Sequence, residues 1–305
     1  MSDGIHTRPN IPDERPTNQK IDDQQTKRLW IDSLFRILKS KTSLIGLCII
    51  IILIITAIFA PIIATHSPTD QSIVNRYQTP SAEHYLGTDE LGRDIFSRIV
   101  YGSRYSILIG LIAVGIALIC GVFLGAVAGY AGKWVDQVVM RFIDMLMAFP
   151  SILLAIALVA VLGASLQNAM IAVGIVGVPQ FARIVRAAVL SVKETEYIEA
   201  ARAIGAKHKK ILFQHILPNC LAPIIVQATL SIGTAILDAA GLSFLGLGAQ
   251  PPTPEWGAML SDGRHALQNS PWVVTFPGLA ILLVVLGFNL FGDGLRDALD
   301  PRLKM

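Results

Sequence analysis

The chain has 305 residues, of which 53% are hydrophobic and only 15% are charged, and its formal net charge is +3. Ordinary soluble domains carry about 25% charged residues, so this composition excludes a water-soluble fold. The small net charge gives no indication of nucleic-acid binding. Cys48, Cys120 and Cys220 lie in or beside apolar runs without paired spacing. That placement argues against a disulfide framework or a zinc site, and we interpret the cysteines as apolar packing residues.

The first 25 residues are polar and proline-containing, and they predict a disordered tail. No apolar core follows a short basic start, so the tail does not read as a cleavable signal peptide. Residues 27–41 place apolar side chains at helical spacing among basic ones, which is typical of a helix lying on a membrane surface. A continuation of the first spanning helix fits almost as well. We assign residues 1–42 as a cytoplasmic tail and surface helix.

Six apolar runs follow, each close to the roughly 20 residues that cross a bilayer. They predict an all-α polytopic membrane protein with about six transmembrane helices, in a permease domain over residues 43–292, followed by a cytoplasmic tail at 293–305. The runs are 43–64, 105–130, 143–162, 169–190, 221–240 and 272–291.

Two of the runs carry features that can interrupt a helix. Pro179 predicts a kink in the fourth run, and the glycine-rich segment 241–248 predicts a partly re-entrant end to the fifth. In the second run Gly121, Gly125 and Gly129 recur every four residues. Small residues at this spacing let helices approach closely, so we expect this face to pack within the protein rather than bind a ligand.

Lys and Arg residues predict the orientation, because cytoplasmic loops carry the excess. With the amino terminus inside, twenty of the 25 Lys and Arg residues fall on the cytoplasmic side. The outside loops carry the remaining five: Arg76, Arg93, Arg98, Arg104 and Arg264. An even number of spans, with both termini in the cytoplasm, is the consistent solution.

The longest predicted cytoplasmic loop, residues 191–218, is named here the docking segment, and it reads as two short helices. Ser191 and Glu194 predict a capping box for the first helix, which places Tyr197, Ala201 and Ile204 on one face and ends at Gly205 in a left-handed conformation. The second helix, 206–217, places Ile211, Leu212 and Ile216 on an apolar side and is broken at Pro218. From periodicity alone, docking on a partner and packing on the protein's own helices are equally favoured.

The docking segment resembles the EAA loop of ABC importer permeases. In that pattern E-A-A is followed after three residues by G, then after nine residues by I, one further residue and L-P. Here the matching positions are Glu199, Ala200, Ala201, Gly205, Leu217 and Pro218. His215 stands where the pattern has isoleucine, and Ile216 is next to it. The resemblance implies that this loop docks on ATP-binding subunits.

The resemblance extends over nearly the whole chain after the tail, to the C-type permease subunit of dipeptide and oligopeptide ABC importers. It implies the type I importer permease fold, a homologous B-type permease, two ATP-binding subunits, an extracellular binding protein, peptide cargo and a place in the cytoplasmic membrane. The matching stretches are 86–89, 92–94, 97–98, 148–150, 241–248, 251–252, 256–257, 292–297 and 300–301. For these stretches it implies mostly structural roles, and for 87–98 a place on the external face between the first two helices.

The sequence contains no phosphate-binding loop, and its six histidines show neither H-E-x-x-H nor paired ligand spacing. We therefore expect a transport subunit that is not an enzyme and binds no cofactor itself, with ATP and magnesium used by partner subunits. Asp238, near the end of the fifth run, is the best candidate for a pathway or gate residue, because a charge within the membrane is costly. An interfacial position, or a cap on the turn into Gly241, is the competing interpretation.

Other functions remain open at this stage. An ion-coupled secondary transporter needs charged residues near the bilayer midplane and often inverted repeats, and only Asp238 fits. A membrane enzyme or anchor needs a catalytic cluster or a large soluble domain, and we find neither. Within the importers, the resemblance does not decide between dipeptides, oligopeptides and nickel, the last being carried by a related branch of permeases.

Overall fold

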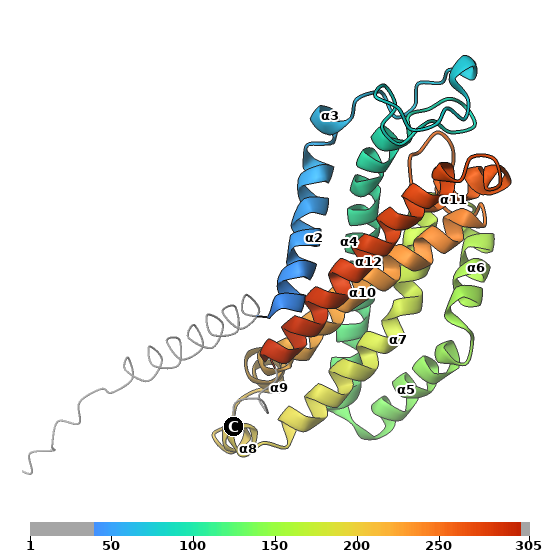
Figure 1. Cartoon of the computed structure of the whole chain (residues 1–305). Coiled ribbons are helices and arrows are strands. Elements are labelled where there is room, and N and C mark those ends of the chain that lie inside the picture. Colours follow the sequence, from blue (N-terminus) through green and yellow to red (C-terminus); the bar gives the residue numbers. More distant parts are fainter. Residues whose placement is uncertain (1–39, 300–305) are drawn as a thin grey trace, which may run out of the picture.

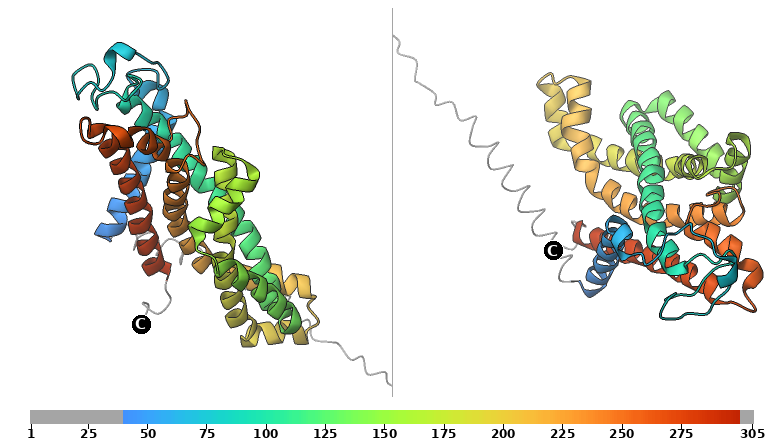
Figure 2. Two further views of the ribbon diagram at one scale, coloured as in Figure 1. Left: turned by 90° about the vertical axis from the view of Figure 1, so that its right-hand side faces the viewer. Right: turned by 90° about the horizontal axis from the view of Figure 1, so that it is seen from above.

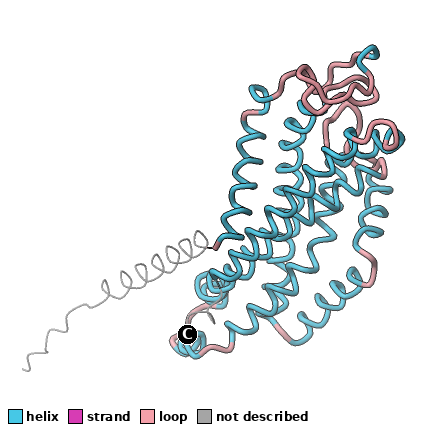
Figure 3. The backbone as a smooth tube through the Cα atoms, in the orientation of Figure 1, coloured by secondary structure: helices cyan, strands magenta, loops and turns pink. Residues whose placement is uncertain are grey.

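The computed structural model describes residues 40–299, and their regular elements are helices apart from an isolated bridge between Thr88 and Asp94 (Figures 1 and 3). The predicted tail, nearly all of the predicted surface helix, and the residues from 300 onward lie outside the described residues. The all-α expectation is confirmed for the part of the chain that can be seen.

Five helices are long and apolar enough to cross a membrane, and a sixth span results if a bent pair counts as one. The expectation of about six spans is therefore met. The five are α2 (Lys41–Ile58), α4 (Ile95–Ala131), α7 (Leu166–Lys193), the continuous helical segment His208–Phe244 and α12 (Trp272–Leu299). Helix α7 is uninterrupted at Pro179.

The third apolar run, 143–162, is not one continuous helix. It is divided between α5 (Lys133–Met147) and α6 (Ser151–Leu162), whose axes differ by 91° across a break at Pro150. Proline cannot donate the backbone hydrogen bond that would continue the helix. With 12 residues, α6 is roughly 18 Å long, too short to cross a bilayer alone. Figure 1 shows α5 turned sharply away from the direction of α6.

Helices α4 and α7 pack closely through the glycine face predicted for the second run. A Cβ atom at Gly121 would lie 2.4 Å from the Cβ of Phe181, and one at Gly125 would lie 2.4 Å from the carbonyl oxygen of Ala182. Gly129 is similarly close to Val189, at 3.0 Å. Such contacts leave no room for any side chain, so the packing interpretation of these glycines is confirmed.

Helices α2 and α12 lie side by side at one edge of the bundle, with α10 (Leu221–Phe244) next to α12 (Figures 1 and 2). The first residues of α2 and the last residues of α12 lie at the same end of the molecule, which also carries the docking segment (Figure 1). Both ends of the described chain therefore share one side, as an even number of spans requires.

The opposite end is closed by a structure that we name the loop cap, consisting of residues 64–94 and α11 (Trp256–Gly263). Three of its charged groups, Asp89, Arg93 and Asp94, are buried and paired. The Arg93 Nε donates to the Asp89 carboxylate at 2.6 Å, and its Nη2 lies 3.3 Å from Asp262. The Glu255 carboxylate caps α11, and burial raises its pKa while hydrogen bonds from two backbone N–H groups oppose the rise. Short elements α3 (Ala60–Ile63), η1 (Ile73–Asn75) and η4 (Arg264–Ala266) complete this end.

The second apolar run begins earlier than hydropathy predicted. Asp94 caps α4 by accepting a hydrogen bond from the Ser97 N–H at 2.8 Å, and the helix starts at Ile95 rather than at residue 105. Arg98 and Arg104, which were assigned to a loop, therefore lie in the first turns of α4. Both side chains have partners there: the buried Arg98 faces the loop cap, and Arg104 donates to the carbonyl of Ala57 at 2.7 Å.

Candidate docking and translocation sites

The docking segment contains one separate short helix, α8 (Glu196–Ala203), which ends as the sequence predicts. Gly205 has a φ of +83°, the left-handed conformation. Its N–H donates to the carbonyl of Arg202 at 2.9 Å, and the N–H of Ala206 donates to the carbonyl of Ala201 at 3.1 Å. These two bonds form a Schellman motif, which satisfies carbonyls at the helix end and turns the chain sharply.

After the turn the chain is helical again and does not stop at Pro218. Helix α9 (His208–Lys210), the π-helical stretch η2 (Ile211–Ile216) and the 3₁₀ turn η3 (Leu217–Cys220) lead directly into α10. The predicted break is therefore wrong. The wider π turns, in which the Leu217 N–H bonds to the carbonyl of Leu212, accommodate a proline that has no N–H of its own.

One face of the docking segment packs on the protein's own helices. Ile198, Ile211 and Ile216 are fully buried together with Val185 and Val189 of α7. Side chains with this degree of burial hold α8 and the following turns firmly against the bundle, because removing a buried isoleucine side chain costs about 2–5 kcal/mol. The expected apolar side of the second helix is confirmed.

The opposite face is uncovered. Tyr197, Ile204 and Phe213 are 45%, 85% and 64% exposed, respectively. Glu199 and Ala200 are exposed and Ala201 is half-buried, all on the same short helix. The predicted stripe of Tyr197, Ala201 and Ile204 thus faces away from the bundle, while Ile198 makes the internal contact. Packing on the protein's own helices therefore describes one face of the segment, and docking on a partner stays a prediction for the exposed face.

The remaining residues of the predicted docking site lie where the two helical parts meet. His215 is half-buried and its carbonyl accepts from the side-chain amide of Asn219 at 2.7 Å. The same amide donates to the Tyr197 hydroxyl at 3.1 Å, which joins α8 to the turn η3 before α10. Leu217 is half-buried and Pro218 is exposed. Sequence reasoning missed Asn219, because a single amide carries no periodic signal.

The predicted capping box at Ser191 and Glu194 is wrong. Helix α7 continues to Lys193, so Ser191 lies inside it, and α8 begins only after Thr195, whose hydroxyl donates to the carbonyl of Val192. Packing of Val189 against the buried core extends α7 beyond the point suggested by local capping signals.

Two polar contacts link the docking segment to the end of α4, and an ion pair links α5 to α7. The hydroxyl of Tyr130 lies 2.8 Å from the Nδ1 of His208, and Lys193 donates to the carbonyl of Tyr130 at 2.8 Å. Arg186 of α7 forms a bidentate ion pair with Asp136 of α5, which holds α5 against α7.

Asp238 lines a cavity of about 160 Å³ between α4, α6, α7 and α10. Its side chain is half-buried, and α10 continues for six residues beyond it to Phe244. No described residue hydrogen-bonds to or forms an ion pair with its carboxylate, so the competing interpretation as a cap of the turn into Gly241 is wrong. Gln180, Ser231 and Thr234 line the same cavity.

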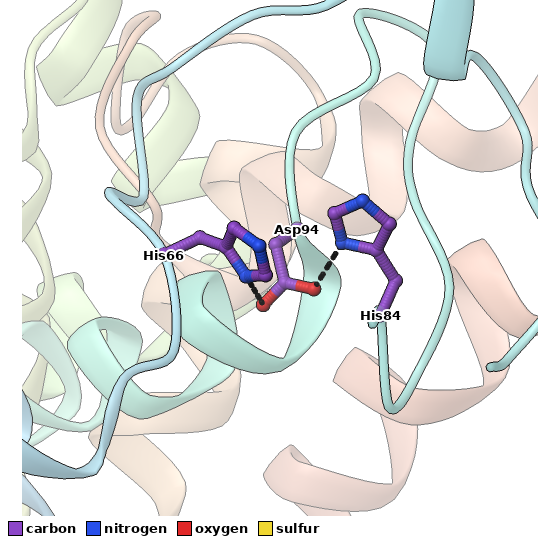
Figure 4. A group of neighbouring side chains, drawn as sticks. All are labelled: His66, His84 and Asp94. Atoms are coloured by element: carbon purple, nitrogen blue, oxygen red, sulfur yellow. Dashed lines mark hydrogen bonds and ion pairs between the residues drawn. The ribbon is translucent and has the colours of Figure 1, made fainter. Parts of the chain in front are cut away.

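His66, His84 and Asp94 meet in the loop cap (Figure 4), although their sequence spacing gives no hint of it. The Nδ1 of His84 lies 2.9 Å from one oxygen of Asp94, and the Nδ1 of His66 lies 3.9 Å from the other. Nitrogen and carboxylate ligands at such separations suit a transition metal. The Asp94 carboxylate is also the cap of α4, and this network anchors the loop before α4 to the helix.

Comparisons with known families agree with this arrangement. Residues 121–305 match the family described as "Binding-protein-dependent transport system inner membrane component". Residues 28–80 match the "N-terminal TM domain of oligopeptide transport permease C". The first match covers more than half of the chain and includes the whole docking segment.

Curated relatives are similar over almost the full length. A dipeptide transport system permease protein DppC of Alkalihalophilus pseudofirmus is 56% identical over 98% of this chain and 98% of its own. A di/tripeptide permease of Pseudomonas aeruginosa is 49% identical over 87% of this chain and 89% of its own. A glutathione permease, GsiD, of Pectobacterium atrosepticum is 46% identical over 93% and 95% of the two chains.

Among solved structures, an inward-facing MetNI methionine ABC transporter matches with a TM-score of 0.56 at 20% sequence identity, over 67% of this chain and 96% of that one. At this level of identity the likeness shows the fold alone, and it confirms the expected ABC importer permease fold. Together with the family match and the relatives, it shows that the chain belongs to the inner-membrane permease family of binding-protein-dependent ABC transport systems, whose ATPase is a separate subunit.

Proposed function

We propose that the chain is the C-type permease of an importer for dipeptides or oligopeptides. The support comes from the full-length similarity to peptide permeases and from the docking segment, whose matching residues form an exposed surface on a firmly packed base. The glutathione permease among the relatives also carries a small peptide by its name. The exposed face of the docking segment is the single observation that carries the coupling part of the proposal.

A working importer on this proposal contains further chains. A homologous B-type permease covers the grooved face near Asp238, two ATP-binding subunits associate with the complex, and an extracellular binding protein delivers the peptide. One ATP-binding subunit docks on Tyr197, Ile204 and Phe213, since exposed apolar side chains of this size on a rigid base are typical of protein interfaces.

The proposed orientation places the docking segment and both chain termini in the cytoplasm. The Lys and Arg asymmetry supports this choice, because the docking end carries Lys193, Arg202, Lys207, Lys209 and Lys210. The loop cap then faces outward, where a binding protein would approach.

The proposed coupling mechanism follows from the continuity of the helix. The segment His208–Phe244 is helical over 37 residues, so it runs roughly 55 Å from the docking surface to beyond Asp238. When the ATP-binding subunits close, they would displace α8 and this segment together, because Ile198, Ile211 and Ile216 share one buried cluster. The far end would then move relative to α4 and α7 and open the pathway outward.

Uptake by the reconstituted complex tests this function. Proteoliposomes containing the permease pair, the ATPase subunits and the binding protein should accumulate labelled alanyl-alanine or a labelled tetrapeptide only with ATP inside the compartment that contacts the docking segment. Nickel should not accumulate. ATP-dependent nickel uptake without peptide uptake, or uptake driven by an ion gradient without ATP, would contradict the proposal.

A further inference from the structure

A second hollow along α7 adjoins the cavity at Asp238. A groove of about 620 Å³ at the break between α5 and α6 shares Ser151, Val176 and Gln180 with it. The groove reaches Arg183 farther along the same face of α7. Both hollows are lined by α7, with Asp238 toward the loop cap and Arg183 toward the docking segment.

The two charged side chains along this track differ in their partners. Arg183 donates to the carboxylate of Asp144 at 2.6 Å, so its charge is already compensated. Asp238 has no such partner among the described residues, and the residues that line its cavity include no Lys, Arg or His. A carboxylate within a membrane-spanning helix is costly unless a cation compensates its charge. The site is therefore built to receive a positive charge from outside the chain.

We propose that Asp238 binds the terminal ammonium group of the peptide as it passes through the permease; this inference rests on the proposed function. Every peptide with a free amino terminus carries this cation regardless of its sequence, so one carboxylate suits cargo of varied side chains. The neutral groups of Gln180, Ser231 and Thr234 can hydrogen-bond the peptide backbone next to it. At about 160 Å³, the cavity is smaller than whole-ligand pockets of 300–1,000 Å³, so it takes one end of the peptide.

Uptake kinetics of the complete complex give the first test. Asp238→Asn keeps the size of the side chain and removes its charge, and it should lower kcat/KM for alanyl-alanine about tenfold or more, the effect expected for losing a hydrogen bond between charged groups. Asp238→Glu should retain most of the uptake. Thr229→Val, a neutral change on the same helix outside the cavity lining, removes only a hydroxyl that donates to the carbonyl of Ile225. It should stay within about threefold of the parent, and all variants should reach the membrane at parental levels.

A reporter cysteine gives a second test. Its readout depends on the charge of Asp238, and a purely structural role of Asp238 would not change it. Thr234 lies one helical turn from Asp238 and is exposed, so Thr234→Cys, in a chain lacking the three native cysteines, should react faster with a cationic than with an anionic methanethiosulfonate. Adding Asp238→Asn should reduce this rate ratio about tenfold, since a unit charge acts with opposite sign on the two reagents. Alanyl-alanine should slow the reaction with the cationic reagent more than N-acetylated alanyl-alanine does. Asn269→Cys on the loop-cap end should show none of these changes.

The outcomes separate the two proposals. If the parent complex imports no peptide with ATP, the proposed function fails and this inference fails with it. If the parent imports peptide and Asp238→Asn imports it equally well, only the inference fails. It also fails if Asp238→Glu is as defective as Asp238→Asn, or if the reagent ratio at Thr234→Cys does not depend on Asp238.

Discussion

The loop cap and the docking segment, at opposite ends of the bundle, differ in whether their side chains find partners within the chain. In the loop cap, buried charges find partners within the chain: Arg93 is only 1% exposed and contacts both Asp89 and Asp262. At the other end, the docking segment buries Ile198 but leaves Ile204 85% exposed. The cap pairs its buried charges within this subunit, whereas we propose that another chain covers the docking surface. Substitutions at the two ends should therefore fail differently, one in folding and the other in coupling.

The largest effect is expected in the loop cap. Arg93→Ala leaves the Asp89 carboxylate buried without its closest cation, and breaking a buried pair in this way costs about 3–5 kcal/mol. The variant should be strongly depleted from the membrane, as measured by immunoblot of membrane fractions. Arg76→Ala, which removes an exposed arginine from the same loop, is the control and should accumulate normally. Normal abundance of Arg93→Ala would show that the cap does not depend on its buried charges.

The next effect compares two isoleucines at opposite faces of the docking segment. Ile198→Ala should lower the free energy of unfolding by about 2–5 kcal/mol because it leaves a cavity, and this should appear as a lower melting temperature of the purified permease. Ile204→Ala should leave the melting temperature unchanged and reduce co-purification of the ATPase. Equal behaviour of the two variants in both assays would remove the distinction between an inner and an outer face.

A smaller effect is expected at Gly205, where φ is +83° and no atom would lie within 4 Å of an added Cβ. The cost of a side chain there is conformational only, roughly 1–2 kcal/mol. Gly205→Val should spare membrane abundance but displace α8, so that uptake and ATPase binding are lost. Gly205→Asn, a residue that tolerates the left-handed conformation better, should retain more of both. If valine and asparagine behave alike, the turn does not control docking.

The smallest perturbation tests which end faces outward. In a background without Cys48, Cys120 and Cys220, a cysteine replacing the exposed Asn269 should react with an impermeant thiol reagent added to intact cells. One replacing Lys207 should react only after the membrane is opened. Both positions are exposed, so neither change should affect stability. Labelling of position 207 from outside would reverse the orientation and leave the docking segment on the wrong side for ATP.

Most of the helical architecture could be predicted because apolar length and glycine spacing are local properties of the sequence. The turn at Gly205 was predictable for the same reason. The bend at Pro150 was not, since an uninterrupted apolar run hides a change of direction that depends on how α5 pairs with α7 through Asp136 and Arg186. The early start of α4 was also missed, because hydropathy treats the buried Arg98 as a loop residue.

For the candidate sites too, the sequence predicted local features but not those that depend on tertiary packing. The docking residues were predicted from the motif within 199–218, and their docking role stays a prediction. The burial of Ile198 and the exposure of Ile204 depend on tertiary packing against α7. The continuation of the helix through Pro218 depends on π turns that no propensity scale anticipates. Likewise, Asp238 was identified from its sequence position alone, whereas the hollow that it shares with α7 required the assembled bundle.

The most direct test of the central claim is a photo-crosslink from the docking surface in native membranes. A photoreactive amino acid at position 204 should form an adduct with an ATP-binding subunit, whereas the same residue at the exposed position 83 in the loop cap should form none. That result would show that the exposed face of the docking segment contacts an ATP-binding subunit. Absence of an ATPase adduct from position 204, with the complex intact and the probe active, would contradict the account.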